Sequence, residues 1–125
     1  MTRKRILIID DEQQVISALQ KKLGEEGFDV LTASDGKEGL EKALKDNPDL
    51  ILLDLILPII DGVTLLDKLK TDDNVKEIPV IILTNLDDSD KVDECRKKGV
   101  YDYLVKINWT LEDISKKVKS VFGEN

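Results

Sequence analysis

The segment Ile6-Leu7-Ile8-Ile9-Asp10-Asp11 decides the fold class of this chain. Four aliphatic residues in a row are typical of a strand that is buried on both faces, as in a parallel sheet covered by helices. The two acidic residues come where such a strand ends. Two further apolar runs end in the same way, 50–53 before Asp54 and 101–105 before Lys106. The pattern indicates buried strands with charged side chains at their ends.

Apolar runs alternate with segments of helical periodicity along the chain. The expected strands are 6–9, 29–33, 50–53, 80–83 and 101–105. Between them, apolar residues recur every three or four positions, which predicts amphipathic helices. This alternation predicts an α/β protein of the flavodoxin-like (βα)5 class. It is a three-layer sandwich whose five-stranded parallel sheet has the order 2-1-3-4-5.

Polar residues at expected helix starts give the element boundaries. Ser34 or Asp35 opens the second helix, Asp61 is the expected N-cap of the third, and Thr110 to Asp113 resembles a capping box before the last. The fourth helix, about 89–98, has only Val92 and Cys95 spaced to face inward. We expect it to be the most mobile helix. It is either a solvated surface helix or an element that shifts in signalling.

The totals restrict the class of protein. The length of 125 residues predicts one domain over residues 1–125. The net charge of −7 argues against direct binding of nucleic acid. No apolar run is long enough to span a membrane. Cys95 is the single cysteine, which excludes an intramolecular disulfide and favours a cytoplasmic protein. Histidine is absent, so any phosphohistidine chemistry must belong to a partner.

The charged strand ends should converge on one edge of the sheet. In the order 2-1-3-4-5, ligands bind where strands 1 and 3 meet, at their carboxyl ends. Asp10 and Asp11 then lie beside Asp54, with Thr84 and Lys106 on the same rim. Clustered carboxylates repel each other by roughly 3 kcal/mol per pair at about 5 Å and need a cation. Mg²⁺, with oxygen ligands, fits this need.

The same residues predict phosphoryl chemistry. Asp54 would be the nucleophile, Lys106 would neutralise a phosphoryl oxygen, and the Thr84 hydroxyl would donate to another. Each residue has an ordinary alternative role when it is taken alone. Asp10 and Asp11 are also suited to capping the first helix, Asp54 to ending a strand, Thr84 to a β-strand and Lys106 to the surface. Their joint occurrence at four strand ends favours the functional interpretation.

These motifs make the chain similar to the receiver domain of two-component response regulators, of the single-domain chemotaxis-regulator type. The resemblance covers essentially the whole chain and is carried by Ile8-Ile9-Asp10-Asp11-Glu12, Leu53-Asp54-Leu55, Leu57-Pro58, Asp61-Gly62, Thr84 and Lys106. It implies transfer of a phosphoryl group from a kinase phosphohistidine to Asp54. The protein would catalyse only its own phosphorylation and dephosphorylation.

The resemblance also implies roles for individual residues. Asp11, Asp54 and the backbone carbonyl of Ile56 would bind Mg²⁺, and Asp10 would act through a water. Thr84 and Tyr103 would be the switch pair. The partners implied are a histidine kinase or phosphotransfer protein and a downstream protein. The latter would bind the face formed by the fourth helix, the fifth strand and the fifth helix, where Lys91, Tyr103 and Lys116 are candidates.

Three positions depart from the family pattern. Ile107 follows Lys106 where the family usually has a proline in a cis bond; we nevertheless expect a cis bond, although it costs about 2.5–4 kcal/mol before a residue other than proline. Asn85 stands where a small residue is usual. Ile56 and Leu86 flank the site and are apolar. They cannot orient a hydrolytic water, so we expect slow dephosphorylation.

Two other functions remain open on the sequence. One is an interaction module that keeps the pocket without being phosphorylated, which Asn85 and Ile107 favour. The other is a phosphohydrolase with an Asp nucleophile. It is disfavoured because the second acid of such enzymes, two residues after the first, corresponds here to Ile56. We expect a stand-alone receiver, because the chain ends soon after its last helix.

Overall fold

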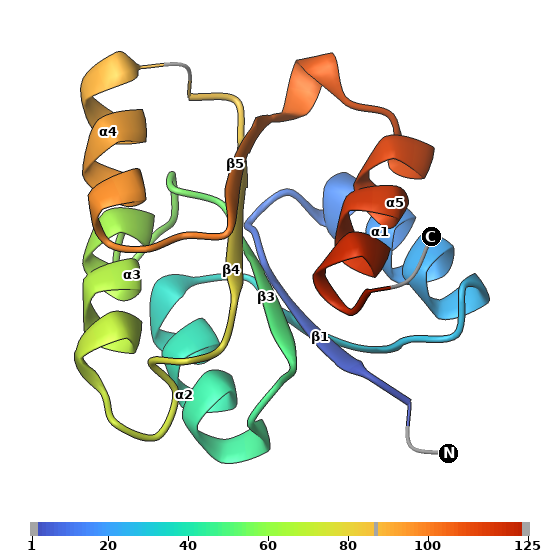
Figure 1. The fold of residues 1–125 in the computed structure, drawn as a ribbon, viewed down its shortest axis with the longest axis horizontal. Helices are drawn as coiled ribbons and strands as arrows, with labels where there is room; N and C mark the ends of the chain where they lie inside the picture. Colours follow the sequence, from blue (N-terminus) through green and yellow to red (C-terminus); the bar gives the residue numbers. More distant parts are fainter. Residues whose placement is uncertain (1–2, 87, 124–125) are drawn as a thin grey trace.

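The computed structural model describes residues 3–86 and 88–123 and has the predicted α/β architecture (Figure 1). Its five parallel strands pair in the order β2-β1-β3-β4-β5, as expected. The strands are β1 (Arg5–Ile9), β2 (Asp29–Ala33), β3 (Leu50–Leu53), β4 (Val80–Thr84) and β5 (Asp102–Val105). β5 begins one residue later than predicted, at Asp102 rather than at Tyr101.

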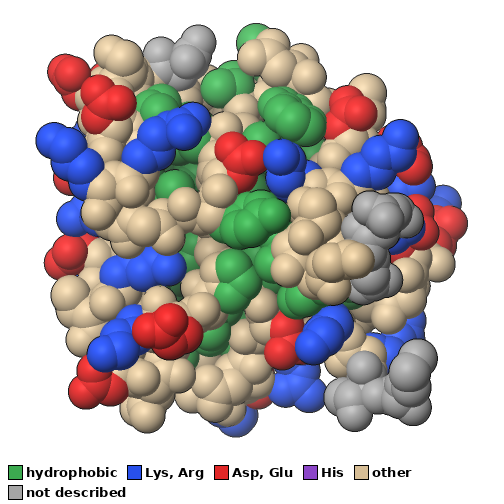
Figure 2. All heavy atoms as spheres, in the orientation of Figure 1, with side chains coloured by type: hydrophobic (Ala, Val, Ile, Leu, Met, Phe, Trp, Pro, Cys, Tyr) green, Lys and Arg blue, Asp and Glu red, His purple; other side chains and the backbone are tan. Residues whose placement is uncertain are grey.

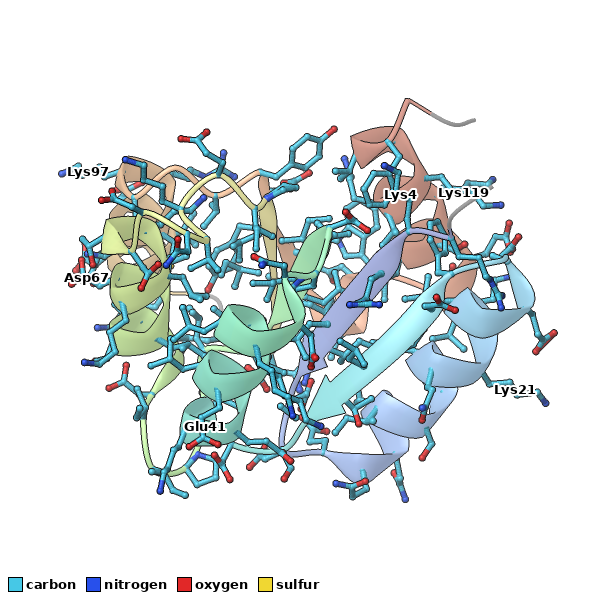
Figure 3. The ribbon with its side chains drawn as sticks, turned by 90° about the horizontal axis from the view of Figure 1, so that it is seen from below. Lys4, Lys21, Glu41, Asp67, Lys97 and Lys119 are labelled. Atoms are coloured by element: carbon cyan, nitrogen blue, oxygen red, sulfur yellow. The ribbon has the colours of Figure 1, made fainter. Side chains whose placement is uncertain are left out.

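Helices cover both faces of this sheet (Figure 1). They are α1 (Gln13–Glu25), α2 (Gly36–Asp46), α3 (Gly62–Thr71), α4 (Ser89–Lys97) and α5 (Leu111–Val121). α1 and α5 lie together on one face, and α2, α3 and α4 lie on the other. Charged side chains such as Lys21, Asp67 and Lys97 point away from the sheet into solvent (Figure 3).

The sheet separates two aliphatic cores. Alternate side chains of a strand point to opposite faces. Thus Leu7 and Ile9 pack in the core under α2, α3 and α4, whereas Ile6 and Ile8 pack in the core under α1 and α5. Burial on both faces explains why the strands appear in the sequence as continuous apolar runs.

The predicted helix starts are confirmed. The Asp61 carboxylate accepts the Thr64 N–H at 3.0 Å and caps α3. Asp35, rather than Ser34, caps α2, and Thr110 and Asp113 form the capping box of α5. These caps satisfy N–H groups that the first helical turn leaves without partners.

The helix α4 has the thin buried face that its sequence predicts. Cys95 is its one fully buried residue among those that the structure describes, and Val92 packs partly against the core. With so little apolar contact, the prediction that this helix opens most easily stands, and hydrogen exchange would test it.

Gly62 sits where no side chain fits, directly beside the phosphoacceptor candidate. A Cβ at this position would lie 2.3 Å from Leu55 Cα and 2.5 Å from the Asp54 carbonyl oxygen. We expect Gly62→Ala to lower the free energy of unfolding by about 2–3 kcal/mol, because backbone must move to make room. Gly24→Ala is the control, since a Cβ there meets no atom within 4 Å and alanine favours the helix. Equal urea midpoints for the two variants would refute this close packing.

Candidate functional site

Two carboxylates meet where β1 and β3 end. Ile9 pairs with Leu53 across the two strands, so the residues that follow them, Asp10 and Asp54, lie side by side. The Asp54 N–H donates to the Ile9 carbonyl at 2.9 Å, which continues the ladder into the site. Asp10 is 2% exposed and Asp54 is 4% exposed. Two carboxylates are thus buried next to each other.

Lys106 supplies the positive charge of the site. Its Nζ lies 2.6 Å from Asp10 Oδ2, 3.0 Å from Asp54 Oδ2 and 3.0 Å from Glu12 Oε1. Burial disfavours the charged ammonium, but its hydrogen bonds to the three carboxylates outweigh burial and raise the pKa of Lys106 above its ordinary value. Burial also raises the pKa of Asp10, and Lys106 offsets this only in part. One ammonium is shared among three acids.

The three acids paired with Lys106 also form a candidate metal site. Carboxylate oxygens of Asp10, Glu12 and Asp54 all lie within 4.8 Å of one another. Hard oxygen donors and a surplus of negative charge suit a divalent cation such as Mg²⁺. These residues therefore fit the magnesium ion that the sequence predicts.

The two acids that follow Asp10 lie differently with respect to the carboxylate cluster. Asp11 is exposed and lies outside the carboxylate cluster, whereas Glu12 belongs to it. Glu12 is the N-cap residue of α1, but its side chain makes no capping hydrogen bond. Asp10 Oδ1 accepts the Glu12 N–H at 2.9 Å, directly before the first turn of α1. Sequence reasoning assigned no role to Glu12, although it directly follows the acidic pair.

Ile56 follows Asp54 along the rim of the pocket. Its backbone N–H donates to Asp54 Oδ1 at 3.2 Å, while its side chain is 60% exposed. Lys106 contacts the other carboxylate oxygen, Oδ2. Each oxygen of Asp54 therefore has one donor, and the carboxylate is fixed in orientation.

Thr84 and Tyr103 come together through Leu86. Thr84 is fully buried at the end of β4, and its Oγ1 accepts the Leu86 N–H at 3.3 Å. The Tyr103 hydroxyl donates to the Leu86 carbonyl at 2.7 Å. Both switch candidates thus contact the loop between β4 and α4, in which Asn85 is exposed.

The chain after Lys106 differs from the prediction. The described residues contain no cis peptide bond, so the Lys106–Ile107 bond is trans and the expected cis bond was wrong. The cost of a cis bond before a residue other than proline favours this outcome. Lys106, Ile107 and Asn108 instead form a short 3-10 helix, and Lys106 still reaches Asp54.

The loop between β3 and α3 is held tightly beside the site. The Gly62 N–H donates to the Leu55 carbonyl at 2.9 Å, and the Gly36 N–H donates to the Pro58 carbonyl at 3.2 Å. Within this loop, Ile59 has a φ of 71° and a side chain that is 74% exposed. A β-branched residue with this backbone conformation is strained.

Comparison with known proteins identifies the family. The family model described as the response regulator receiver domain matches residues 6–119. The chain belongs to this family. Receiver domains are parts of two-component signalling proteins, and the acidic cluster of Asp10, Glu12 and Asp54 agrees with magnesium binding by such a domain.

Two curated relatives illustrate the sequence similarity. The alkaline phosphatase synthesis transcriptional regulatory protein PhoP of Bacillus subtilis is 38% identical over 119 residues, which cover 94% of this chain and 48% of the relative. The response regulator PleD of Caulobacter vibrioides is 40% identical over 102 residues, which cover 82% of this chain and 22% of the relative. This receiver thus spans about half or less of the length of these relatives.

Solved structures share the fold closely. A CheY-like receiver domain protein of Methanospirillum hungatei is similar with a TM-score of 0.90 and 28% identity, over 96% of this receiver and 94% of that chain. The CheX–CheY–BeF3–Mg²⁺ complex of Borrelia burgdorferi gives a TM-score of 0.85 and 31% identity, over 95% and 89% of the two chains. In the part of this receiver that the structure describes, no helix is long and apolar enough to cross a bilayer.

Proposed function

We propose that this receiver is a phosphoacceptor in a two-component phosphorelay, in which Asp54 takes a phosphoryl group from a kinase phosphohistidine. The observation that carries the proposal is the buried Asp54 carboxylate, ion-paired to Lys106 and adjacent to Asp10 at the joint end of β1 and β3. Burial, a fixed orientation and a neighbouring cation are what phosphoryl transfer by positioning requires.

The transfer forms a bond between an Asp54 carboxylate oxygen and phosphorus, while the bond between phosphorus and the donor imidazole nitrogen breaks. The Lys106 ammonium, 3.0 Å from Asp54 Oδ2, is placed to neutralise a phosphoryl oxygen. The buried Thr84 hydroxyl would donate to another oxygen. Mg²⁺, held by Asp10, Asp11, Asp54 and the Ile56 carbonyl, would neutralise charge on the transferred group. Dephosphorylation would be slow, because the Ile56 and Leu86 side chains cannot orient a water.

The partners proposed are a histidine kinase or phosphotransfer protein and a downstream protein, in the cytoplasm. The output surface would be the face of α4, β5 and α5. Apolar side chains gather over β5, with Lys, Arg, Asp and Glu side chains around them (Figure 2). Tyr101, the residue before β5, is 49% exposed. Its link to the pocket would be Tyr103 and Thr84, which both bond to Leu86.

Magnesium is expected to stabilise the protein. The carboxylates of Asp10, Glu12 and Asp54 share one ammonium, so a divalent cation relieves their repulsion in the folded state only. At ten times its dissociation constant, Mg²⁺ should add about 1.4 kcal/mol to the free energy of unfolding. Urea unfolding with Mg²⁺ and with EDTA measures this gain. Superimposable curves would rule out a magnesium site.

Incubation with a small acyl phosphate and Mg²⁺, followed by intact-mass measurement, separates the candidate functions. A phosphoacceptor gains the mass of one phosphoryl group and loses it slowly. An interaction module that is not phosphorylated gains nothing, although it still binds Mg²⁺. A phosphohydrolase instead releases phosphate over many turnovers, which the apolar Ile56 side chain disfavours.

A further inference from the structure

Glu12 belongs to the carboxylate cluster around Lys106, but the proposed phosphoryl transfer includes it neither as the acceptor nor among the proposed Mg²⁺ ligands. We propose that Glu12 is a positioning residue for Lys106, which keeps the ammonium at the pocket when Asp10 and Asp54 turn to a divalent cation. The inference rests on the proposed function, because Glu12 would hold the lysine of the proposed phosphorylation site in place.

The geometry around Lys106 separates the three acids into two kinds. Asp10 and Asp54 are buried at strand ends, and both are proposed to serve the cation. Glu12 lies at the mouth of the pocket with a side chain that is 50% exposed, and its Oε1 is 3.0 Å from Lys106 Nζ. Once a cation engages the two buried acids, Glu12 is the partner that remains for the ammonium.

Lys106 needs such a partner because its own backbone segment has little packing. It opens the short 3-10 helix, in which no residue is buried, and the next side chain, Ile107, is 83% exposed. The lysine side chain itself is 9% exposed, so the ion pairs hold an otherwise flexible arm inside. A bound divalent cation would repel the ammonium, and the Glu12 charge opposes that repulsion.

The backbone of Glu12 is already fixed to the site. Its N–H donates to Asp10 Oδ1 at 2.9 Å, so the residue is tied to one of the two buried acids. Its side chain does not cap α1, although Glu12 is the N-cap residue of that helix. The carboxylate is therefore directed at Lys106 rather than at the helix. A purely structural role in starting α1 does not account for this direction.

Exposure of Lys106 to an amine-reactive reagent, quantified by peptide mass spectrometry, tests the proposal. In the unaltered protein, labelling of Lys106 should change less than about twofold on adding Mg²⁺. In Glu12→Gln, adding Mg²⁺ should raise the labelling of Lys106 roughly tenfold, which is the effect of losing one charge-assisted hydrogen bond. Glu25→Gln, an exposed change at the other end of α1, should behave like the unaltered protein. Glu12→Asp, which retains the charge, should restore much of the protection.

The outcomes distinguish this proposal from the proposed function. If Mg²⁺ raises Lys106 labelling equally in the unaltered protein and in Glu12→Gln, Glu12 does not position the lysine and the proposal is overturned. If labelling and urea unfolding of both proteins ignore Mg²⁺, the magnesium site itself fails, and this inference fails with it. A lower rate of phosphorylation of Glu12→Gln at saturating Mg²⁺, with urea stability unchanged, would support positioning.

Discussion

Asp54→Asn is expected to gain no phosphoryl group from a small acyl phosphate and Mg²⁺, under conditions in which the unaltered receiver gains one. The amide oxygen of asparagine is a poor nucleophile. Asp10 is also buried and paired with Lys106, but its proposed task is to serve the cation. The variant should remain folded. Asparagine has nearly the same shape, and its amide removes one of the three charges that share Lys106.

The control for this variant is Asp73→Asn. Asp73 has a side chain that is 91% exposed and pairs only with Lys76 among the ion pairs of the described chain. It should be phosphorylated as fast as the unaltered protein. A full mass gain in Asp54→Asn would mean that another residue accepts the group. Asp54 would then not be the phosphoacceptor.

Lys106→Met is expected to lower the free energy of unfolding of the metal-free protein by about 3 kcal/mol at neutral pH. The substitution leaves the buried charges of Asp10 and Asp54 without their cation, which is the costly way to break a buried ion pair. Urea unfolding in EDTA measures the loss. Added Mg²⁺ should recover part of it by replacing the missing positive charge.

The loss should shrink as the pH falls. Burial already raises the pKa of Asp10 above its ordinary value, and removal of Lys106 raises it further. A carboxyl group with a raised pKa in the folded state takes up its proton earlier on acidification, so the folded variant gains relative to the unfolded chain. The exposed change Lys21→Met is the control, with no expected loss. A loss below about 1 kcal/mol at neutral pH, or one that grows with acidity, contradicts the view of Lys106 as the counter-ion of buried acids.

The sequence predicts the fold because its strands are buried on both faces. Short apolar runs such as 50–53, which alternate with longer segments of helical periodicity, favour buried strands, and caps such as Asp61 mark where a helix begins. Once parallel strands are expected, their carboxyl ends must share one edge. The proximity of Asp10, Asp54 and Lys106 then follows from topology without any knowledge of side-chain contacts.

The features that were not predicted depend on long-range contacts and on backbone conformations that no local sequence rule specifies. The direction of the Glu12 side chain, toward Lys106 rather than along α1, depends on a lysine 94 positions away in sequence. The trans bond and 3-10 helix after Lys106 replace a family geometry that the sequence here does not require. The positive φ of Ile59 belongs to a residue type that rarely adopts it, so no propensity rule would place it there.

The central claim is that Asp54 accepts a phosphoryl group with the help of Mg²⁺. The most direct test is to treat the receiver with a small acyl phosphate and Mg²⁺, reduce it with borohydride and sequence the peptides by mass spectrometry. Reduction converts an aspartyl phosphate to homoserine. We therefore predict homoserine at position 54, and none when EDTA replaces Mg²⁺. Homoserine at another position, or none anywhere in a folded receiver that binds Mg²⁺, would contradict it.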